Sequence, residues 1–471
     1  MGRNRRKPFL VEKLAITDLA DKGKGFGKDE EGRAIFVEDA APGDVVDVLA
    51  RRKKKSIFLG TIQKFHKRSD TRVTPVCTHF DLCGGCKLQH VSYEQQLAFK
   101  EKDVRNVIQR IGKVEVKEML PILPCKHQVY YRNKLEFSFS SKRWLTREEI
   151  DSGIPNKAQV LGFHPGGAFD KVIDINKCFL QYEPSNFIRN TVRDIAIEQD
   201  LEFFDARQNI GFLRQLMLRI TTLGEIMLVL CVHNNDQEKI QGILDEIIKR
   251  IPGLTSVYYC INTKTNDFMY DLDMELYHGQ AYVEDKLGDV TFQIGPKSFF
   301  QTNTKQAEAL YQVIADFAEF EGTENVYDLY TGIGSIALFI AKYCKQVVGI
   351  EEIELAIKDA KENAVRNKID NTTFYAGDVK NILTPEFAKK HGKPDILITD
   401  PPRSGMHPKV VKMLLELEAP KLIYVSCKPS TQARDFEVLS EKYEVVKCQP
   451  VDMFPHTHHI ENVALLKLKK N

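Results

Sequence analysis

The 471-residue sequence lacks any uninterrupted apolar stretch of the roughly 20 residues that a membrane-spanning helix needs. Its basic start, Met1 to Lys7, is not followed by the long apolar region of a secretory signal. We therefore expect a cytoplasmic protein with no membrane segment. In that reducing compartment the ten cysteines are expected to be metal ligands, nucleophiles or small core residues, not disulfide partners.

The chain also lacks a strong excess of either charge, since 67 Lys and Arg residues stand against 65 Asp and Glu residues. Contact with nucleic acid would therefore need local basic patches. One such patch is the run from Arg51 to Lys55, which lies between two expected strands and is predicted to be a hairpin loop. A run of this kind suits a solvated loop and a phosphate-binding element equally well.

No internal repeat or low-complexity segment divides the chain, and its length exceeds one ordinary core. Short apolar runs separated by glycine and charge, from about residue 8 to 64, predict a small β-barrel. Strands and helices mixed up to about residue 288 predict an α+β middle region. From about residue 290, strands alternate with glycine turns and helices, which predicts a Rossmann-like, doubly wound α/β domain with a parallel sheet.

A nucleoside-cofactor site is predicted in the last region. The segment from Asp328 to Gly334 joins an apolar strand to a helix through a G-x-G turn, which lets a ligand approach the backbone. The third glycine of a dinucleotide fingerprint is missing. Glu351 ends the next strand, where a carboxylate suits ribose hydroxyls or caps a helix. Asp378 suits either an adenine contact or a turn.

Reactive residues are expected at the carboxyl edge of the same sheet. Asp400 enters a stiff double-proline loop after one strand, and Cys427 ends the following strand next to Lys428. Exposure and positive charge would favour a thiolate, although a small core cysteine is the alternative. Glu461 precedes the last apolar run. The histidines just before it lack the spacing of a metal site and are interpreted as a loop that shapes the pocket.

Three cysteines lie close together at Cys77, Cys83 and Cys86, with the spacing C-x5-C-x2-C. In a cytosolic chain this spacing indicates a metal centre whose fourth ligand comes from elsewhere. Zinc and an iron–sulfur cluster both accept four thiolates, so the spacing does not choose between them. Four other cysteines occur in apolar runs and are predicted to be core residues, namely Cys231, Cys260, Cys344 and Cys448.

Six ordered motifs resemble those of the RNA uracil-5-methyltransferase family: FFQTN, DLYTGIGSIAL, GIE, DPPR, VSCKPST and FPHTHHIENVALL. The resemblance runs nearly end to end. It implies a TRAM-type barrel over residues 1–65, a central iron–sulfur domain over 66–92 and 120–288, and a class I methyltransferase domain over 93–119 and 289–471. It also implies an RNA substrate, with ribosomal RNA favoured over transfer RNA, and a monomer.

The resemblance assigns roles to single residues. Cys427 aligns with the family's nucleophile and Glu461 with its general base. The residues implied to contact S-adenosylmethionine are Gln301, Tyr330, Glu351 and Asp400. A [4Fe–4S] cluster is implied on Cys77, Cys83, Cys86 and Cys178, with Cys125 as the competing fourth ligand.

The implied reaction explains why these residue types occur together. Uracil C5 is a poor nucleophile, and a thiolate that adds to C6 makes it carbanion-like, after which a base must remove the C5 proton. The target uridine must leave its stack to reach such a pocket. Cytosine C5 methylation is a rival, but RNA enzymes of that kind carry a cysteine where this chain has Pro402 and Arg403. A non-catalytic RNA-binding or redox-sensing protein is the alternative from another class.

Overall fold

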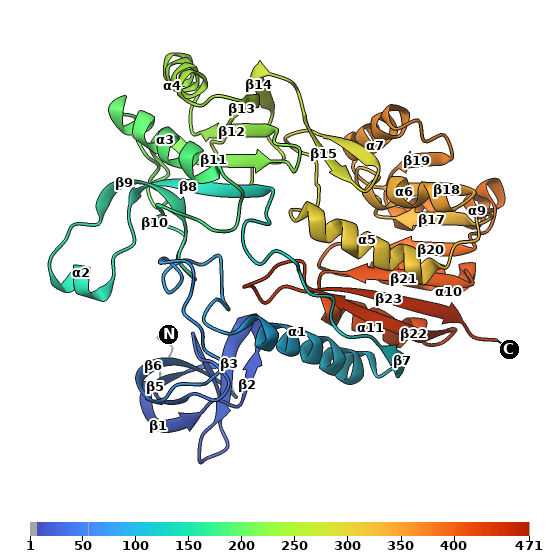
Figure 1. Ribbon diagram of the computed structural model, residues 1–471, viewed down its shortest axis with the longest axis horizontal. Helices are drawn as coiled ribbons and strands as arrows, with labels where there is room; N and C mark the ends of the chain where they lie inside the picture. Colours follow the sequence, from blue (N-terminus) through green and yellow to red (C-terminus); the bar gives the residue numbers. More distant parts are fainter. Residues whose placement is uncertain (1–6, 55, 471) are drawn as a thin grey trace, which may run out of the picture.

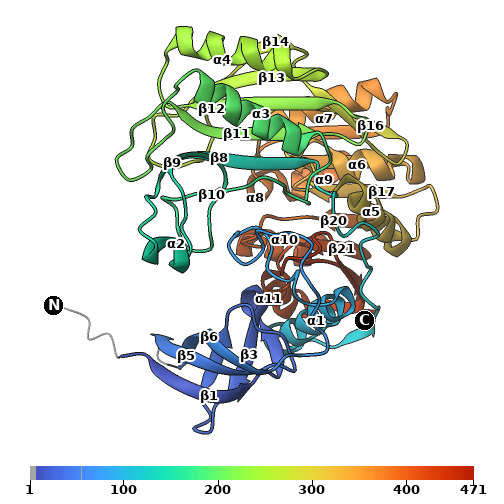
Figure 2. The same cartoon turned by 60° about the vertical axis from the view of Figure 1, so that its left-hand side comes forward.

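The structure is a computed structural model that describes residues 7–54 and 56–470 (Figure 1). It contains an N-terminal barrel-like sheet, a central sheet and a large C-terminal sheet. Figures 1 and 2 both place the barrel beside α1 (Tyr93–Val107), at the opposite end of the molecule from α4 (Gln237–Arg250). Among the described residues, no helix has the length and apolar character needed to cross a membrane.

The N-terminal sheet has six strands in the order β1-β5-β6-β4-β3-β2. Their bounds are β1 (Phe9–Ala15), β2 (Asp18–Ala20), β3 (Lys24–Lys28), β4 (Ala34–Val37), β5 (Val45–Lys54) and β6 (Ile57–Lys67). Its core is a small set of aliphatic side chains, among them the buried Ile35, Val37 and Val48. Alternate residues along each strand fill this core, as expected when only one face of a sheet is buried.

The prediction of a hairpin loop from Arg51 to Lys55 is wrong for most of these residues. Arg51 to Lys54 continue β5, and their backbones pair with β6 as far as Lys54 opposite Ile57. The side chains of Arg51 and Arg52 are exposed, and a paired strand tolerates charge at exposed positions. Lys55 falls outside the described residues.

The central sheet has seven strands in the order β10-β9-β8-β11-β12-β13-β14. The strands are β8 (Lys134–Lys142), β9 (Lys157–Phe163), β10 (Ile173–Asp174), β11 (Leu213–Ile220), β12 (Ile226–Val232), β13 (Leu254–Ile261) and β14 (Met274–Gly279). Helices α3 (Ser185–Glu198) and α4 pack on one face, and α2 (Arg147–Asp151) lies in the β8–β9 connection. Every residue of β11 and β12 is buried, because the opposite face packs on the C-terminal domain.

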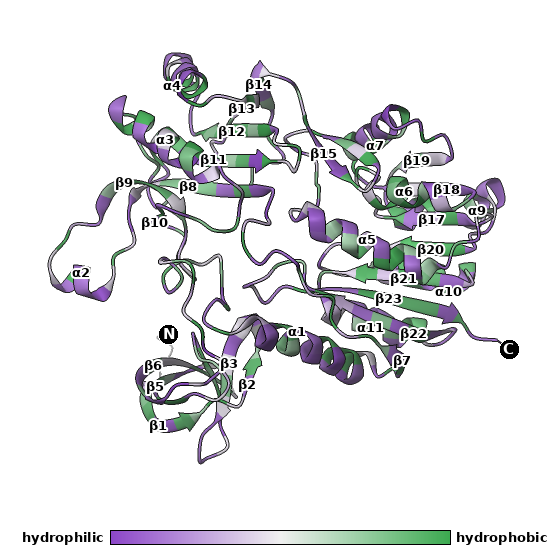
Figure 3. Ribbon diagram, in the orientation of Figure 1, coloured by the Kyte–Doolittle hydropathy of each residue, from purple (hydrophilic) through white to green (hydrophobic). Residues whose placement is uncertain are grey.

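The C-terminal sheet has eight strands in the order β19-β18-β17-β20-β21-β23-β22-β7. They are β7 (Val116–Met119), β17 (Asn325–Leu329), β18 (Gln346–Glu351), β19 (Thr372–Ala376), β20 (Ile396–Thr399), β21 (Lys421–Ser426), β22 (Tyr443–Val451) and β23 (Glu461–Leu468). Figure 3 shows the apolar residues concentrated along β20, β21 and β23. The predicted parallel sheet is confirmed for five strands, whereas β23 runs antiparallel to β21 and β22.

Helices cover both faces of this sheet, and the hairpin of β15 (Val283–Leu287) and β16 (Val290–Ile294) leads into it. The helices are α5 (Thr304–Ala318), α6 (Ser335–Ile340), α7 (Glu354–Arg366), α8 (Val379–Ile382), α9 (Pro385–His391), α10 (Pro408–Leu417) and α11 (Pro429–Leu439). Strand order reverses between β17 and β20. Ligands of such sheets bind outside the carboxyl ends of the strands at this point, so the topology fixes where a site can form.

Candidate active site

Four predicted site residues meet at one edge of the C-terminal sheet. Glu351 ends β18, Asp400 follows β20 and Cys427 follows β21. Glu461 is the first residue of β23, and because that strand is antiparallel its first residue reaches the same edge. Ser426 pairs with Asn462. Cys427 follows Ser426 and Glu461 precedes Asn462, so the two residues are neighbours across the two strands. The register therefore brings thiol and carboxyl side by side.

The glycine turn between β17 and α6 leaves room for a ligand. Gly332 has a φ of +57°, and a Cβ built on it would meet no atom within 4 Å. Its N–H donates to Glu351 Oε2 at 3.2 Å, and the Ile353 N–H donates to Glu351 Oε1 at 3.1 Å. The turn thus fixes the carboxylate at the tip of β18 beside an open space, which fits the ribose of an adenosyl group.

The other two residues implied to contact the cofactor, Tyr330 and Gln301, come from two different segments. Tyr330 has a φ of +65°, and its N–H donates to the Ile350 carbonyl at 2.9 Å. The buried Gln301 lies in the loop before α5, and its carbonyl accepts from Asn133 Nδ2 at 2.9 Å. Asp378 caps α8 by accepting from the Lys380 N–H at 3.0 Å. This is the turn role that was one of the two alternatives for Asp378.

Three acidic side chains share the centre of the site. Burial raises the pKa of Asp328 to about 7, and one of its oxygens has no hydrogen-bond partner among the described residues. Burial, followed by the nearby Asp328, raises the pKa of Asp400 to about 7. Burial and Asp400 together raise the pKa of Glu461 well above its usual range. Such a concentration of carboxyl groups suits a cationic ligand, and the sulfonium of S-adenosylmethionine is one.

The thiol of Cys427 is neutral in this environment. Burial, then Glu461 and Asp400, raise its pKa to about 11, whereas Arg403 lowers it through its charge and a hydrogen bond. The expectation of a thiolate rested on Lys428, but that side chain is exposed and the buried carboxyl groups outweigh it. Sequence reasoning missed both the acidic partner Asp328 and the basic partner Arg403, although each lies in a motif already noted.

The double-proline loop that carries Arg403 is held by α11. Arg434 donates to the carbonyls of Ser404 and Met406, both at 3.2 Å. Asp435 accepts from the Met406 N–H at 3.1 Å and from the Tyr424 hydroxyl at 2.7 Å. Because α11 begins two residues after Cys427, the same helix positions the thiol and the loop facing it.

The histidine-containing loop before Glu461 is fixed from outside the sheet. Asp452 accepts from Lys100 Nζ at 2.6 Å and from the Tyr93 hydroxyl at 2.8 Å, both on α1. Gln96 accepts from the His456 N–H at 2.9 Å. Burial lowers the pKa of His456 to about 4, so it is neutral at neutral pH. This agrees with the interpretation of the loop as a structural part of the pocket.

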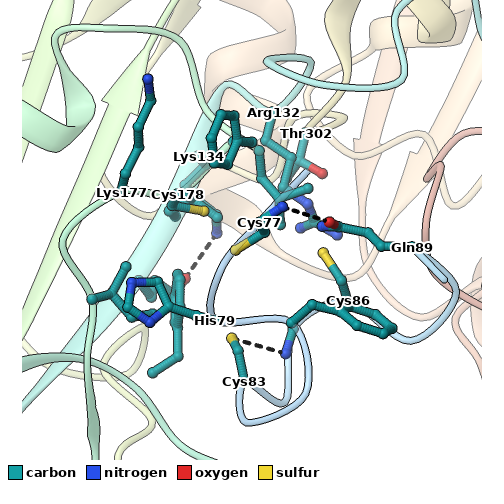
Figure 4. Close-up of a pocket in the computed structure, with 18 residues that line it drawn as sticks. Cys77, His79, Cys83, Cys86, Gln89, Arg132, Lys134, Lys177, Cys178 and Thr302 are labelled. Atoms are coloured by element: carbon teal, nitrogen blue, oxygen red, sulfur yellow. Dashed lines mark hydrogen bonds and ion pairs between the residues drawn. The ribbon is translucent and has the colours of Figure 1, made fainter. Parts of the chain in front are cut away.

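The four cysteines implied to hold a cluster line one cavity of about 350 Å³. Figure 4 shows the sulfur atoms of Cys77, Cys83, Cys86 and Cys178 facing the same space. Cys125 lies elsewhere, where its Sγ donates to the His127 carbonyl at 3.1 Å. Among the described residues, no group of three or more Cys, His, Asp or Glu side chains is placed to hold a metal ion. The metal centre therefore stays a prediction, while the four cysteines assigned to the core are confirmed as buried.

A family model described as tRNA (Uracil-5-)-methyltransferase matches residues 212–469, more than half of the chain, and a TRAM domain model matches residues 5–57. The chain belongs to the tRNA (uracil-5-)-methyltransferase family. An RNA methyltransferase of Bacteroides thetaiotaomicron, described as uncharacterized, is 47% identical and covers 96% of this chain and 100% of its own. A similar relative of Chlorobaculum tepidum is 41% identical over 98% of this chain and 96% of its own.

A solved structure gives the same assignment. The tRNA (uracil-54, C5)-methyltransferase of Pyrococcus abyssi, in complex with S-adenosyl-L-homocysteine, is 28% identical with a TM-score of 0.75. The match covers 96% of this chain and 99% of that one. The protein is thus an S-adenosylmethionine-dependent RNA uracil-C5 methyltransferase of this family, and the predicted TRAM-type barrel and class I methyltransferase fold are confirmed.

Proposed function

We propose that the protein methylates C5 of a specific uridine in RNA through a covalent adduct between Cys427 and C6. The observation that carries this proposal is the placement of Cys427 beside Glu461 at the cofactor edge of the sheet. S-adenosylmethionine supplies the methyl group when bound. Gln301, Tyr330, Glu351 and Asp400 are proposed to hold it, with Glu351 at the ribose and Asp400 near the sulfonium.

The site residues divide the proton and bond changes between them. Cys427 gives its proton to solvent and its sulfur bonds to C6, which shifts the C5–C6 π electrons onto C5 and the C4 carbonyl. C5 then accepts the methyl group as the bond from that group to the sulfonium sulfur breaks, which leaves a neutral thioether. Glu461, as a carboxylate, removes the C5 proton, and the C5–C6 double bond re-forms as the sulfur leaves. Arg403, which already lowers the pKa of Cys427, would favour the thiolate in the first step.

Two substitutions test this mechanism. Cys427→Ala should abolish methyl transfer from labelled S-adenosylmethionine and form no protein–RNA adduct. Glu461→Gln should lower turnover by about 100-fold or more, because proton removal loses its base. This second variant should accumulate a methylated adduct that survives denaturing electrophoresis. Methyl transfer at the wild-type rate by the Cys427→Ala protein would contradict the proposal.

We further propose a [4Fe–4S] cluster on Cys77, Cys83, Cys86 and Cys178, with a structural or RNA-binding role. Their shared cavity supports this set over one that includes Cys125. Iron and sulfide assays on anaerobically purified protein, with a visible absorption spectrum, test it. Zinc without iron would contradict the cluster.

The target RNA remains open to test. The barrel and cysteine motifs favoured ribosomal RNA in the sequence, whereas the solved Pyrococcus abyssi enzyme acts on transfer RNA, which supports transfer RNA as the second candidate. Mapping 5-methyluridine in ribosomal and transfer RNA from cells with and without the gene separates the two. The cytoplasmic location and the monomeric state also stay predictions.

A further inference from the structure

Gln301 lies in a segment that has no regular structure of its own. Residues 295–303 connect β16 to α5 and form neither helix nor strand. Buried backbone groups of such a segment need hydrogen-bond partners elsewhere in the protein. Two residues of the central domain supply partners. One is Arg219 of β11, whose Nη2 donates to the Ser298 carbonyl at 3.2 Å, and the other is Asn133.

Asn133, which precedes β8, makes three hydrogen bonds to this segment and to the start of α5. Its N–H donates to the Thr302 carbonyl at 2.7 Å. Its Nδ2 donates to the Gln301 carbonyl and to Thr304 Oγ1, both at 2.9 Å. Asn133 is buried, so water does not replace these bonds when they are lost. One residue of the central domain thus fixes the carbonyl groups of two successive residues, Gln301 and Thr302.

A third group fixes the orientation of the Asn133 amide. The Thr304 hydroxyl donates its single proton to Asp285 Oδ2 at 2.7 Å, so its oxygen can only accept from Asn133. The NH₂ group of Asn133 must therefore face Thr304, and its second N–H is left for the Gln301 carbonyl. Asp285, on β15, also accepts from the Thr222 N–H at 3.1 Å, in the turn between β11 and β12. The network thus joins the central sheet to the first residue of α5 in one defined arrangement.

The segment is also held on its other side. Asn303 Nδ2 donates to the Met453 carbonyl at 2.9 Å, in the loop before Glu461. Gln301 therefore stands between an anchor on the central domain and an anchor on the active-site loop. The bond from Asn133 goes to the carbonyl of Gln301, which leaves the side-chain amide available to the cofactor.

We propose that Asn133 is a positioning residue for S-adenosylmethionine, which acts by fixing the backbone at Gln301. A side chain on an irregular segment is placed only as well as its backbone, and a displacement of about 1 Å is enough to weaken a polar contact to a ligand. The central domain therefore completes the cofactor site of the methyltransferase domain. The inference rests on the proposed function, because Gln301 is there proposed to hold the cofactor.

Calorimetric binding of S-adenosylhomocysteine to the full chain tests this role. Asn133→Asp keeps the shape of the side chain but places an oxygen against the Gln301 carbonyl, so binding should weaken about tenfold. Asn133→Ala removes the bond without adding charge and should weaken binding about fivefold, which keeps the test open if the first variant fails to fold. Asn262→Ala is the matched control. Asn262 is equally buried in the central domain, but its Nδ2 donates to the Asn266 carbonyl at 3.1 Å, so this variant should bind like the wild type.

A double-mutant cycle separates positioning from general destabilisation. If Asn133 acts through the side chain at position 301, Asn133→Ala/Gln301→Ala should bind S-adenosylhomocysteine no more weakly than Gln301→Ala alone. In steady-state assays, Asn133→Ala should raise KM for S-adenosylmethionine and leave kcat at saturating cofactor and KM for RNA within about twofold. Additive losses in the cycle, or wild-type affinity in both Asn133 variants, would overturn the inference.

The binding measurement is independent of the methyl-transfer chemistry. The Cys427→Ala protein should show the same dependence on Asn133, so a failure of the covalent mechanism would leave this result intact. Wild-type affinity in Gln301→Ala would instead overturn the proposed cofactor contact of Gln301, and the role of Asn133 with it.

Discussion

Cys427 stands in a pocket whose fixed charges oppose its ionisation. Burial and two carboxyl groups raise its pKa to about 11, whereas Arg403 lowers it. Burial and the nearby Asp400 also raise the pKa of Glu461, which the proposed reaction needs as a carboxylate, well above its usual range. A cationic cofactor would relieve both, because one positive charge favours every anion near it. We therefore expect Cys427 and Glu461 to ionise more readily when the cofactor is bound.

The reactivity of the free thiol follows from this pKa. Without cofactor, alkylation of Cys427 by iodoacetamide should be slow at pH 7 and rise about tenfold per pH unit up to pH 9, since only the thiolate reacts. Arg403→Met should be slower at each pH, because it removes the charge that lowers the pKa. Mass spectrometry of the Cys427 peptide measures both rates. A rate that is already constant at pH 7 would show that the thiolate is present without the cofactor.

Asp400 should make the folded state less stable as the pH rises. Its pKa is about 7 in the folded protein against about 4 in an unfolded chain. The contribution to stability is therefore full below pH 4 and is lost as the pH rises to about 7. Asp400→Asn removes the buried charge, so it should raise the free energy of unfolding by about 1–2 kcal/mol at pH 8, after allowance for the partial exposure of the side chain.

Asp400→Asn should raise the free energy of unfolding by less at pH 5, because Asp400 of the folded wild type is still protonated at that pH. Thermal unfolding at both pH values measures the difference, with the exposed Asp370→Asn as control. Asp400→Asn should also weaken binding of S-adenosylmethionine, because the proposed cofactor site loses a carboxylate. An equal effect on stability at both pH values would show that Asp400 ionises normally.

At the scale of elements, α1 is part of the active site although it touches none of the reacting atoms. The side chain of Lys100 and that of Asp452 are both fully buried, and they pair at 2.6 Å. Lys100 also donates to the Phe454 carbonyl at 3.1 Å. The pair thereby holds the loop that enters β23 at Glu461.

Breaking this pair should be costly. Lys100→Met leaves the Asp452 carboxylate buried with no cation, which should lower the free energy of unfolding by about 3–5 kcal/mol. The double variant Lys100→Met/Asp452→Asn should recover part of that loss, since it removes the unpaired buried carboxylate. Chemical denaturation of the three proteins measures this. Equal stability of single and double variants would mean that the carboxylate finds another partner.

Sequence patterns located the edge residues because each follows an apolar strand, and parallel strands end at one edge. They could not supply the antiparallel course of β23, which depends on tertiary pairing with β21. They also placed Arg51 in a loop, because charge within a strand looks like a strand end until the partner strand is known. The pKa of Cys427 depended on residues far apart in the chain, so a neighbouring lysine in the sequence was a poor guide.

At the scale of the molecule, the cysteine segment (residues 77–91) is hydrogen-bonded to the active-site loop before Glu461 (residues 452–460). The N–H groups of Lys87 and Leu88, just after Cys86, donate to the His456 carbonyl at 2.8 and 3.0 Å. On the other side, Gln96 Nε2 donates to the carbonyls of Leu88 and Val91 at 2.9 and 2.8 Å. Whatever orders the cysteine segment therefore also orders the loop before Glu461.

Loss of a cysteine ligand should consequently be felt at the active site. In Cys83→Ser, the amides of residues 84–91 and of 452–460 should both exchange hydrogen about tenfold faster, because they share these bonds. Cys344→Ser is the matched control, since Cys344 is buried outside both segments. Hydrogen–deuterium exchange with mass spectrometry resolves the two peptides. If exchange rose only in residues 84–91, α1 alone would be sufficient to hold the loop, and the cysteine segment would be mechanically separate from catalysis.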